Sequence, residues 1–496
     1  MPTHPPRSAP IAMDAATFRA LGHELVDHLA TLIASVPSGP VARDESATPI
    51  RAALDLTRAL PEAGTDPAAL LRKTATELFA HSLFNQHPRF FGYITAPPAP
   101  IGVLGDLLAA ALNPNVSSWR LAPAATEIEL QTVRWIAELI GFPTSAGGLL
   151  VSGGNMANFV CFFAARAAKA PWKIRETGMT GGNGKRLIVY GSTEMHTWIQ
   201  KAADLSGLGT ASIRWIETDA ELRMDVGALA RQVDADRAAG YVPFLVVGTA
   251  GSVSTGAIDA LDEIGTFCKT QNLWFHVDGA YGAFAAATAE APAELRALAG
   301  ADSVAVDPHK WLYAPLEAGC ALVRDADALR DAFAYHPPYY HFGEQVENFV
   351  DFGFQNSRGF RALKVWLALS HVGAAGYRQM IADDIALARR LADAVRRTGE
   401  LELFTQSLSI TTFRFVPADL RAAAEEPANV KYLNDLNAKV LDHLQRRGEA
   451  FVSNAVVDGR YVLRACIVNF HTDAGDIDAL PDIVVRAGRE LHGARN

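Results

Sequence analysis

Several features that would indicate particular functions are scarce or absent in this 496-residue chain. The net charge of −9 comes without any block of basic residues, which argues against nucleic acid or an anionic membrane as the main partner. The four cysteines form no CxxC or Cys/His pair, so we expect them to be reduced packing residues. The most hydrophobic stretch, residues 100–114, is interrupted by Asp106 and is too short to span a bilayer. These absences favour a cytoplasmic protein that acts on small molecules and makes no membrane contact.

Motifs for metals and nucleotides are absent as well. In HELVDH, residues 23–28, the second histidine falls five positions after the first and leaves the helix face that two zinc ligands must share. In GGNGKR, residues 181–186, Arg186 stands where a phosphate-binding loop needs Ser or Thr, and no GxGxxG occurs. We therefore predict neither a metal site nor a nucleotide site.

The texture of the chain changes twice along its length. Apolar residues at helical spacing in 14–36 and 67–85 predict an N-terminal helical segment, assigned to residues 1–95. Short β-branched runs then alternate with amphipathic helical patterns, which predicts an α/β domain with a mostly parallel sheet over 96–370. A long helical pattern, a strand pair around an Asp-Gly turn and a last helix predict a smaller α+β domain over 371–496.

Three polar features follow strand-like runs in the central part. Gly153 and Gly154 open a helix, where exposed backbone N–H groups suit a phosphate, although an ordinary glycine turn is the commoner explanation of a Gly-Gly pair. Asp278 ends the run LWFHVD, and Lys310 follows SVAVD within DPHKW. Pyridoxal 5′-phosphate (PLP) needs an anion site, a carboxylate for its ring nitrogen and an amine for its aldehyde. The trio therefore predicts PLP, and His196, otherwise a polar loop residue, could stack on its ring.

Eight blocks in the same order resemble the group II pyridoxal-phosphate decarboxylases, which include aromatic L-amino-acid, tyrosine, histidine and glutamate decarboxylases. These blocks are HPRFFGY, NPNVSSWRLAPAATEIE, SGGNMAN, the stretch around His196, TAGSVSTGAID, HVDGAYG, VDPHKW and SRGFRALKVW. The resemblance implies the PLP-dependent transferase fold type I, with a seven-stranded, mostly parallel sheet in the large domain. It also implies an obligate homodimer with active sites shared between subunits and an N-terminal segment that wraps around the partner.

The resemblance implies a role for each motif residue. Lys310 is the Schiff-base lysine, Asp278 pairs with the pyridine nitrogen and His196 stacks on the ring. Tyr339, in the stretch AYHPPYYHFGEQ, occupies the place of the catalytic tyrosine. The further cofactor contacts that it implies are Gly153, Gly154, Asn155, Ser252, Ala280 and His309.

Tyr339 bears on the outcome of the reaction. Loss of CO₂ leaves a carbanion at Cα, and a phenol on a closing loop can protonate it while excluding water. Without such an acid, oxygen can intercept the carbanion and the product becomes an aldehyde. The presence of both Tyr339 and His196 favours the amine, although Tyr339 outside this motif would be interpreted as a packing residue.

Residues near the expected substrate site depart from the pattern of the family. Ser118 stands where aromatic decarboxylases often carry a bulky aromatic residue, and Arg120 where they carry a small one. Arg120 is either a ligand for a substrate carboxylate, which favours an acidic substrate, or an interface ion-pair partner. Ser357 is the residue that many tyrosine-type members carry. The candidate substrate residues are Tyr93, Val116, Ser118, Arg120 and Ser357.

The leading prediction is PLP-dependent decarboxylation of an aromatic L-amino acid, such as tyrosine, tryptophan, phenylalanine or DOPA, to the amine and CO₂. Two alternatives on the same scaffold stay open. One is a carboxy-lyase for another L-amino acid, of the glutamate or diaminobutyrate type. The other is an oxidative decarboxylase that releases an aldehyde.

Overall fold

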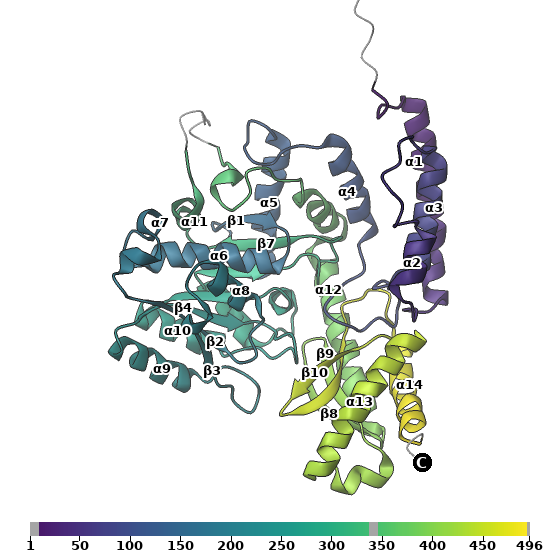
Figure 1. The fold of residues 1–496 in the computed structure, drawn as a ribbon. Helices are drawn as coiled ribbons and strands as arrows, with labels where there is room; N and C mark the ends of the chain where they lie inside the picture. Colours follow the sequence, from purple (N-terminus) through teal and green to yellow (C-terminus); the bar gives the residue numbers. More distant parts are fainter. Residues whose placement is uncertain (1–8, 337–345, 494–496) are drawn as a thin grey trace, which may run out of the picture.

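A seven-stranded sheet forms the centre of the large domain in the computed structural model, which describes residues 9–336 and 346–493 (Figure 1). The strand order is β1-β7-β6-β5-β4-β2-β3, in which β7 runs antiparallel to both neighbours and the other neighbouring pairs are parallel. The strands are almost wholly buried runs of apolar residues, as expected for a sheet covered on both faces. Their bounds are β1 (Gly147–Val151), β2 (Leu187–Ser192), β3 (Ile213–Ile216), β4 (Val242–Thr249), β5 (Trp274–Asp278), β6 (Ser303–Val306) and β7 (Gly319–Val323).

Helices cover this sheet (Figure 1). The helix α6 packs against β1 and β4–β7, and its buried face is formed mainly by alanine and phenylalanine. The helices of the large domain are α4 (Pro100–Leu112), α5 (Pro123–Leu139), α6 (Gly154–Lys169), α7 (Ile174–Thr177), α8 (Trp198–Leu205), α9 (Val226–Ala238), α10 (Leu261–Gln271) and α11 (Ala326–Phe333).

A four-stranded antiparallel sheet in the order β10-β11-β9-β8 organises the smaller C-terminal domain. Its strands are β8 (Leu401–Ser407), β9 (Ile410–Phe415), β10 (Ser453–Val457) and β11 (Arg460–Cys466). Two helices, α13 (Pro427–Arg447) and α14 (Ala474–Gly493), pack on each other beside it (Figure 1). The strand pair predicted around the Asp-Gly turn is β10 and β11.

The helix α12 (Ala362–Arg397) joins the two domains. Gly373, with φ of 69°, interrupts it, because this backbone conformation lies outside the helical region. Before this kink Trp366 donates to Gln131 of α5 (2.7 Å), and after it the carbonyl of Ala388 accepts from Thr411 of β9 (3.0 Å). The part after the kink also contacts the large domain, because Trp311 and Tyr313 donate to Asp384 (2.8 and 2.7 Å). The boundary between residues 370 and 371 therefore stays a prediction.

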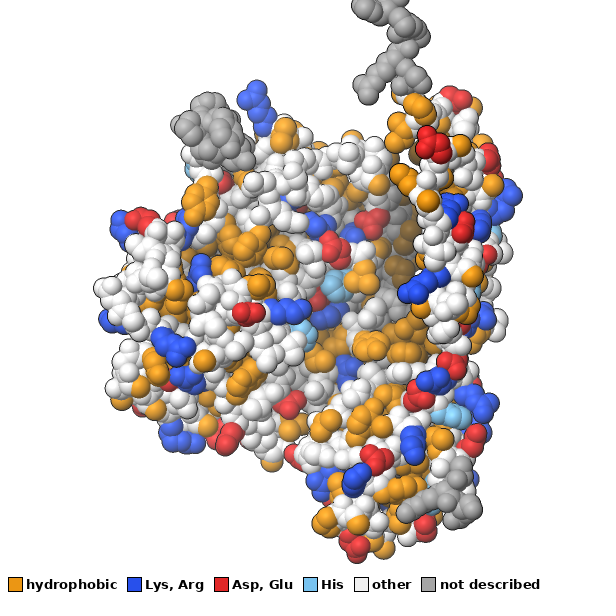
Figure 2. All heavy atoms as spheres, in the orientation of Figure 1, with side chains coloured by type: hydrophobic (Ala, Val, Ile, Leu, Met, Phe, Trp, Pro, Cys, Tyr) orange, Lys and Arg blue, Asp and Glu red, His pale blue; other side chains and the backbone are white. Residues whose placement is uncertain are grey.

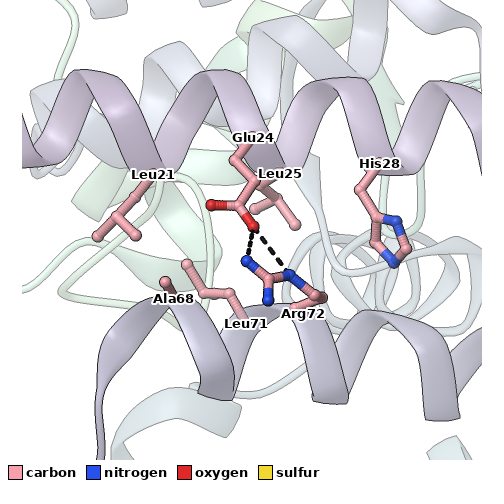
Figure 3. Close-up of a pocket in the computed structure, with 7 residues that line it drawn as sticks. All are labelled: Leu21, Glu24, Leu25, His28, Ala68, Leu71 and Arg72. Atoms are coloured by element: carbon pink, nitrogen blue, oxygen red, sulfur yellow. Dashed lines mark hydrogen bonds and ion pairs between the residues drawn. The ribbon is translucent and has the colours of Figure 1, made fainter.

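Three N-terminal helices, α1 (Ala15–Ser35), α2 (Ala47–Ala53) and α3 (Pro67–Ala80), lie along one side of the molecule (Figure 1). Figure 3 shows a small pocket between α1 and α3, where Arg72 is paired with Glu24 among leucines. None of the predicted site residues lines this pocket. Across the described ranges, no helix combines the length and apolar character that a bilayer crossing requires.

The predicted fold class is confirmed. The large domain carries the mostly parallel seven-stranded sheet, and the C-terminal domain is α+β. The four cysteines are buried and unpaired, as the scattered spacing indicates.

Candidate active site

The candidate catalytic residues lie just beyond the carboxyl ends of strands that run in one direction. Asp278 is the last residue of β5, Lys310 follows β6 by four positions, and Gly153 follows β1 by two. Since β7 is antiparallel to both β1 and β6, the ends of β1 and β6 meet at the same edge of the sheet. This edge is where open α/β sheets bind ligands.

The amine of Lys310 is held by a carboxylate that the sequence analysis did not select. Lys310 Nζ lies 2.9 Å from Oδ2 of Asp307, and the side chain of Asp307 is almost fully buried. His309 Nε2 lies 3.7 Å from the same oxygen, and burial lowers the pKa of His309 while Asp307 raises it. Oδ1 of Asp307 has no hydrogen-bond partner among the described residues. The lysine is therefore partly buried and beside a carboxylate with spare hydrogen-bonding capacity.

The glycine pair packs directly against this lysine turn. Gly153 has φ of 99°, and a Cβ there would lie 3.2 Å from Cε1 of His309. A Cβ on Gly154 would lie 2.6 Å from Oδ2 of Asp307 and 3.1 Å from Cβ of Ala280. The two glycines thus permit a close backbone approach that larger residues would block. Because α6 begins at Gly154, with exposed Asn155 in its first turn, unpaired helix N–H groups open into this region.

Asp278 is a buried carboxylate whose two oxygens each accept one hydrogen bond. The indole Nε1 of Trp198 donates to Oδ2 (2.8 Å), and the backbone N–H of Ala280 donates to Oδ1 (3.2 Å). The carbonyl of Asp278 accepts from Ala250 (2.9 Å), which brings the end of β4 to the same place. Two residues later Ser252 is buried, with its hydroxyl 3.0 Å from that of Thr255.

His196 lies in the loop between β2 and α8 and is exposed on one side. The backbone N–H of Trp198 donates to its Nδ1 (3.2 Å). Partial burial, which removes water from the charged ring, is the main cause that lowers the pKa of His196. The charge of Asp278 raises this pKa, and that of Lys310 lowers it. Both groups are therefore close enough to His196 to act on its charge.

These groups fit the polar groups of PLP. The helix start at Gly154 suits its phosphate, the oriented carboxylate of Asp278 suits a protonated pyridine nitrogen, and Lys310 supplies an amine. Two buried oxygens near this edge, Asp307 Oδ1 and Thr249 Oγ1, also lack partners among the described residues. A polar ligand would satisfy such atoms.

A comparison with known families identifies the family of this chain. The model of the pyridoxal-dependent decarboxylase conserved domain matches residues 51–416. The chain belongs to the pyridoxal-dependent decarboxylase family. The resemblance predicted from the motifs is thereby confirmed, as are the dependence on pyridoxal phosphate and the decarboxylase class.

Relatives of this family match nearly the whole chain. An aromatic-L-amino-acid decarboxylase of Bacillus atrophaeus is 34% identical, covering 93% of this chain and 93% of the relative. A phenylacetaldehyde synthase of a Rosa hybrid cultivar is 29% identical, covering 92% of this chain and 91% of that one. Among solved structures, Oryza sativa TDC with PLP and tryptamine has a TM-score of 0.90 at 27% identity, covering 98% of this chain and all of that one.

Two of the candidate substrate residues are buried in the large domain. Val116 is fully buried, and both its backbone groups pair with Arg358, whose guanidinium donates to the Val116 carbonyl (2.9 Å). Ser118 is almost fully buried, and its neighbours on either side contact the 348–350 segment. The structure thus brings the segments that carry Ser118 and Ser357 side by side.

The other three candidate substrate residues are exposed. Tyr93, with φ of 54°, contacts the small domain, where its N–H donates to Ser453 (3.3 Å) and its ring packs near Phe451. Neither Arg120 nor Ser357 makes a side-chain hydrogen bond or ion pair to another residue of the described ranges, so both alternatives for Arg120 remain proposals. Tyr339 lies outside the described residues.

The sequence analysis missed two residues that contact the predicted site. Asp307 stands inside the quoted DPHKW stretch, and the reasoning applied to Asp278, that an acid ending a core strand needs a cationic partner, applied equally to it. Trp198 follows His196 by two positions, but nothing in the sequence indicates that its indole reaches Asp278 across 80 residues.

Proposed function

We propose that this protein uses PLP to decarboxylate an aromatic L-amino acid, releasing the amine and CO₂. The observation that carries the proposal is the convergence of the amine of Lys310, the carboxylate of Asp278 and the Gly153–Gly154 helix start at one edge of the sheet. The choice of an aromatic substrate is supported by the 34% identical aromatic-L-amino-acid decarboxylase.

We propose a role for each of the candidate residues. Lys310 supplies the amine that binds PLP, Asp278 faces its ring nitrogen and His196 stacks on its ring. When bound, PLP accepts the electron pair left as the Cα–carboxylate bond breaks. We assign the proton transfer to Cα to Tyr339, as expected from its motif. The proposed remaining contacts are Gly153, Gly154 and Asn155 at the phosphate, with Ser252 and His309 nearby and Ala280 against the ring.

A second candidate activity is oxidative decarboxylation to the aldehyde, favoured by the similarity to a phenylacetaldehyde synthase. Purified protein loaded with PLP should be given tryptophan, tyrosine, phenylalanine, DOPA, glutamate and 2,4-diaminobutyrate in turn. CO₂, amine, aldehyde and hydrogen peroxide are then quantified, with Lys310→Ala as the inactive control. Amine in equal amount to CO₂ from an aromatic substrate supports the proposal. Aldehyde with peroxide, or turnover of glutamate or 2,4-diaminobutyrate alone, would replace it with one of the alternatives.

We further propose that the chain works as a homodimer with shared active sites. Along α1, α3 and α4 many large apolar side chains are exposed, which is costly for a lone chain. Figure 2 shows hydrophobic side chains gathered along the hollow between the N-terminal helices and the body of the molecule. The exposed apolar residues of α1, α3 and α4 include Phe18, Val26, Ile33, Leu70, Leu71, Leu78, Val103, Leu104, Leu107, Leu108 and Leu112. Light scattering that gave the mass of a single chain would refute the dimer.

The cytoplasmic location also remains our proposal. Its support is that the four cysteines, Cys161, Cys268, Cys320 and Cys466, are buried and free, as expected in a reducing compartment. Fractionation of cells that express the tagged protein tests this location.

A further inference from the structure

Trp198 contacts two groups of the site at once. Its side chain is fully buried at the first turn of α8, and its indole Nε1 donates to Oδ2 of Asp278 at 2.8 Å. Its backbone N–H donates to Nδ1 of His196 at 3.2 Å. A single residue therefore bonds the carboxylate expected at the ring nitrogen and the imidazole expected on the ring face.

The indole itself is firmly placed. The ring of His276 packs against the indole edge-on, with the two ring centroids 5.8 Å apart. His276 is fixed in turn by Asn158 (2.7 Å) and Ser303 (2.9 Å), and burial lowers its pKa to about 4, so it is neutral. Because His276 is neutral and both its ring nitrogens are hydrogen-bonded, it offers no charge that competes for the indole of Trp198. The indole N–H points to Asp278 instead.

The two bonds to Asp278 define the direction of its carboxylate. Trp198 holds Oδ2 and the backbone of Ala280 holds Oδ1, so the carboxylate is not free to rotate about its Cβ–Cγ bond. The longer bond, 3.2 Å against 2.8 Å, is the one from Ala280. Both bonds reach the same charged carboxylate, and hydrogen bonds weaken with distance, so the indole bond is the stronger constraint.

The bond to His196 defines which ring nitrogen carries the proton. Nδ1 accepts a hydrogen bond from the backbone, so in neutral His196 the proton sits on Nε2. The lowered pKa of His196 agrees with a neutral ring. The first turn of α8 thereby orients the imidazole and the carboxylate together.

We propose that Trp198 is a positioning residue for the cofactor, which acts through the hydrogen bond of its indole to Asp278 and through its backbone bond to His196. The inference rests on the proposed function, in which Asp278 and His196 face the cofactor ring. It assigns to Trp198 no contact with the substrate.

The test is Trp198→Phe in the full-length protein, with Trp366→Phe as the matched control. Trp366 is half-buried on α12, and its indole donates to the neutral amide oxygen of Gln131 at 2.7 Å. Trp198→Phe removes the indole donor but keeps the backbone N–H to His196. We expect the dissociation constant for PLP to rise by about 10- to 150-fold, the range for loss of one hydrogen bond to a charged group.

Two further readouts separate positioning from a loss of packing. In Trp198→Phe the visible absorbance band of the lysine-bound cofactor should change in position or in its pH dependence, and kcat should fall more than KM rises. In Trp366→Phe both should stay as in the wild type. A Trp198→Phe protein with wild-type PLP affinity and an unchanged band would overturn the inference. If the wild type itself binds no PLP, the proposed function fails instead.

A second measurement leaves Trp198 in place, in case the variant does not fold. In wild-type protein labelled with ¹⁵N-tryptophan, PLP should shift one indole N–H signal, and Asp278→Asn should shift the same signal in the protein without PLP. The signal lost in Trp366→Phe should respond to neither. If no indole signal responds to both changes, Trp198 does not couple to the cofactor through Asp278.

Discussion

The buried ion pair between Arg358 and Glu129 should be one of the most sensitive points of the large domain. Nη2 of Arg358 lies 2.5 Å from Oε1 of Glu129, and both side chains are shielded from solvent. Arg358 also donates to the carbonyls of Val116 (2.9 Å) and Leu150 (2.7 Å), while the N–H of Leu150 donates to Glu129 (2.8 Å). The pair therefore joins the end of β1 to the segment that carries candidate substrate residues.

The substitution Arg358→Met keeps an unbranched chain but removes every donor of the guanidinium. Glu129 is then left as a buried carboxylate that, among the described residues, keeps the hydrogen bond from the N–H of Leu150. Breaking a buried ion pair by removing one partner costs about 3–5 kcal/mol, so we expect the free energy of unfolding to fall by about that amount. Adding Glu129→Leu should recover most of the loss, because no uncompensated charge then remains buried.

The assay is urea unfolding at pH 7 followed by far-UV circular dichroism, with refolding checked by dilution. Arg396→Met is the control, because Arg396 is paired with Asp393 at 2.7 Å but both side chains are more than half exposed. That surface pair should contribute less than about 1 kcal/mol. A loss below about 1 kcal/mol in Arg358→Met would contradict the assignment of a buried, stabilising network.

Three further predictions concern the site. Gly154→Ala should weaken PLP binding by about fivefold or more in an absorbance titration, because overpacking against Asp307 costs about 1–3 kcal/mol. Gly300→Ala is the control, because a Cβ there meets no atom within 4 Å. Equal PLP affinities of the two variants would refute the predicted phosphate site. The free energy of unfolding should fall as the pH drops from about 6.5 to about 4, because the unfolded chain takes up the proton that buried His276, with a pKa of about 4, excludes. Urea titrations at several pH values should show a smaller slope in His276→Gln, and equal slopes would argue against this group. Tyr339→Phe should convert part of the amine product into aldehyde and hydrogen peroxide, measured from an aromatic substrate, and an unchanged amine yield would remove Tyr339 from the proton transfer.

The convergence of the candidate site residues could be predicted from the sequence because they stand directly after strand-like runs. Asp278 and Lys310 end or follow β5 and β6, so parallel strand topology alone brings them to one edge. The Gly153–Gly154 pair was ambiguous as a local pattern, and the close approach of Asp307, His309 and Ala280 resolves why no side chain fits there.

The contacts that support this core could not be predicted in the same way. Trp198 reaches Asp278, and Arg358 reaches Glu129, across 80 and 229 residues. Neither pairing follows from local spacing, because packing of whole elements decides which side chains meet. Ser118 and Ser357 likewise gain their proximity from backbone pairing between distant segments, including that of Val116 with Arg358.

The most direct test of the account is to identify the lysine that carries the cofactor. Purified protein is loaded with PLP, reduced with borohydride and digested, and the peptides are analysed by mass spectrometry. The account predicts a phosphopyridoxyl group on Lys310, and loss of both this label and CO₂ release in Lys310→Ala. A label on another lysine, or full CO₂ release by Lys310→Ala, would contradict it.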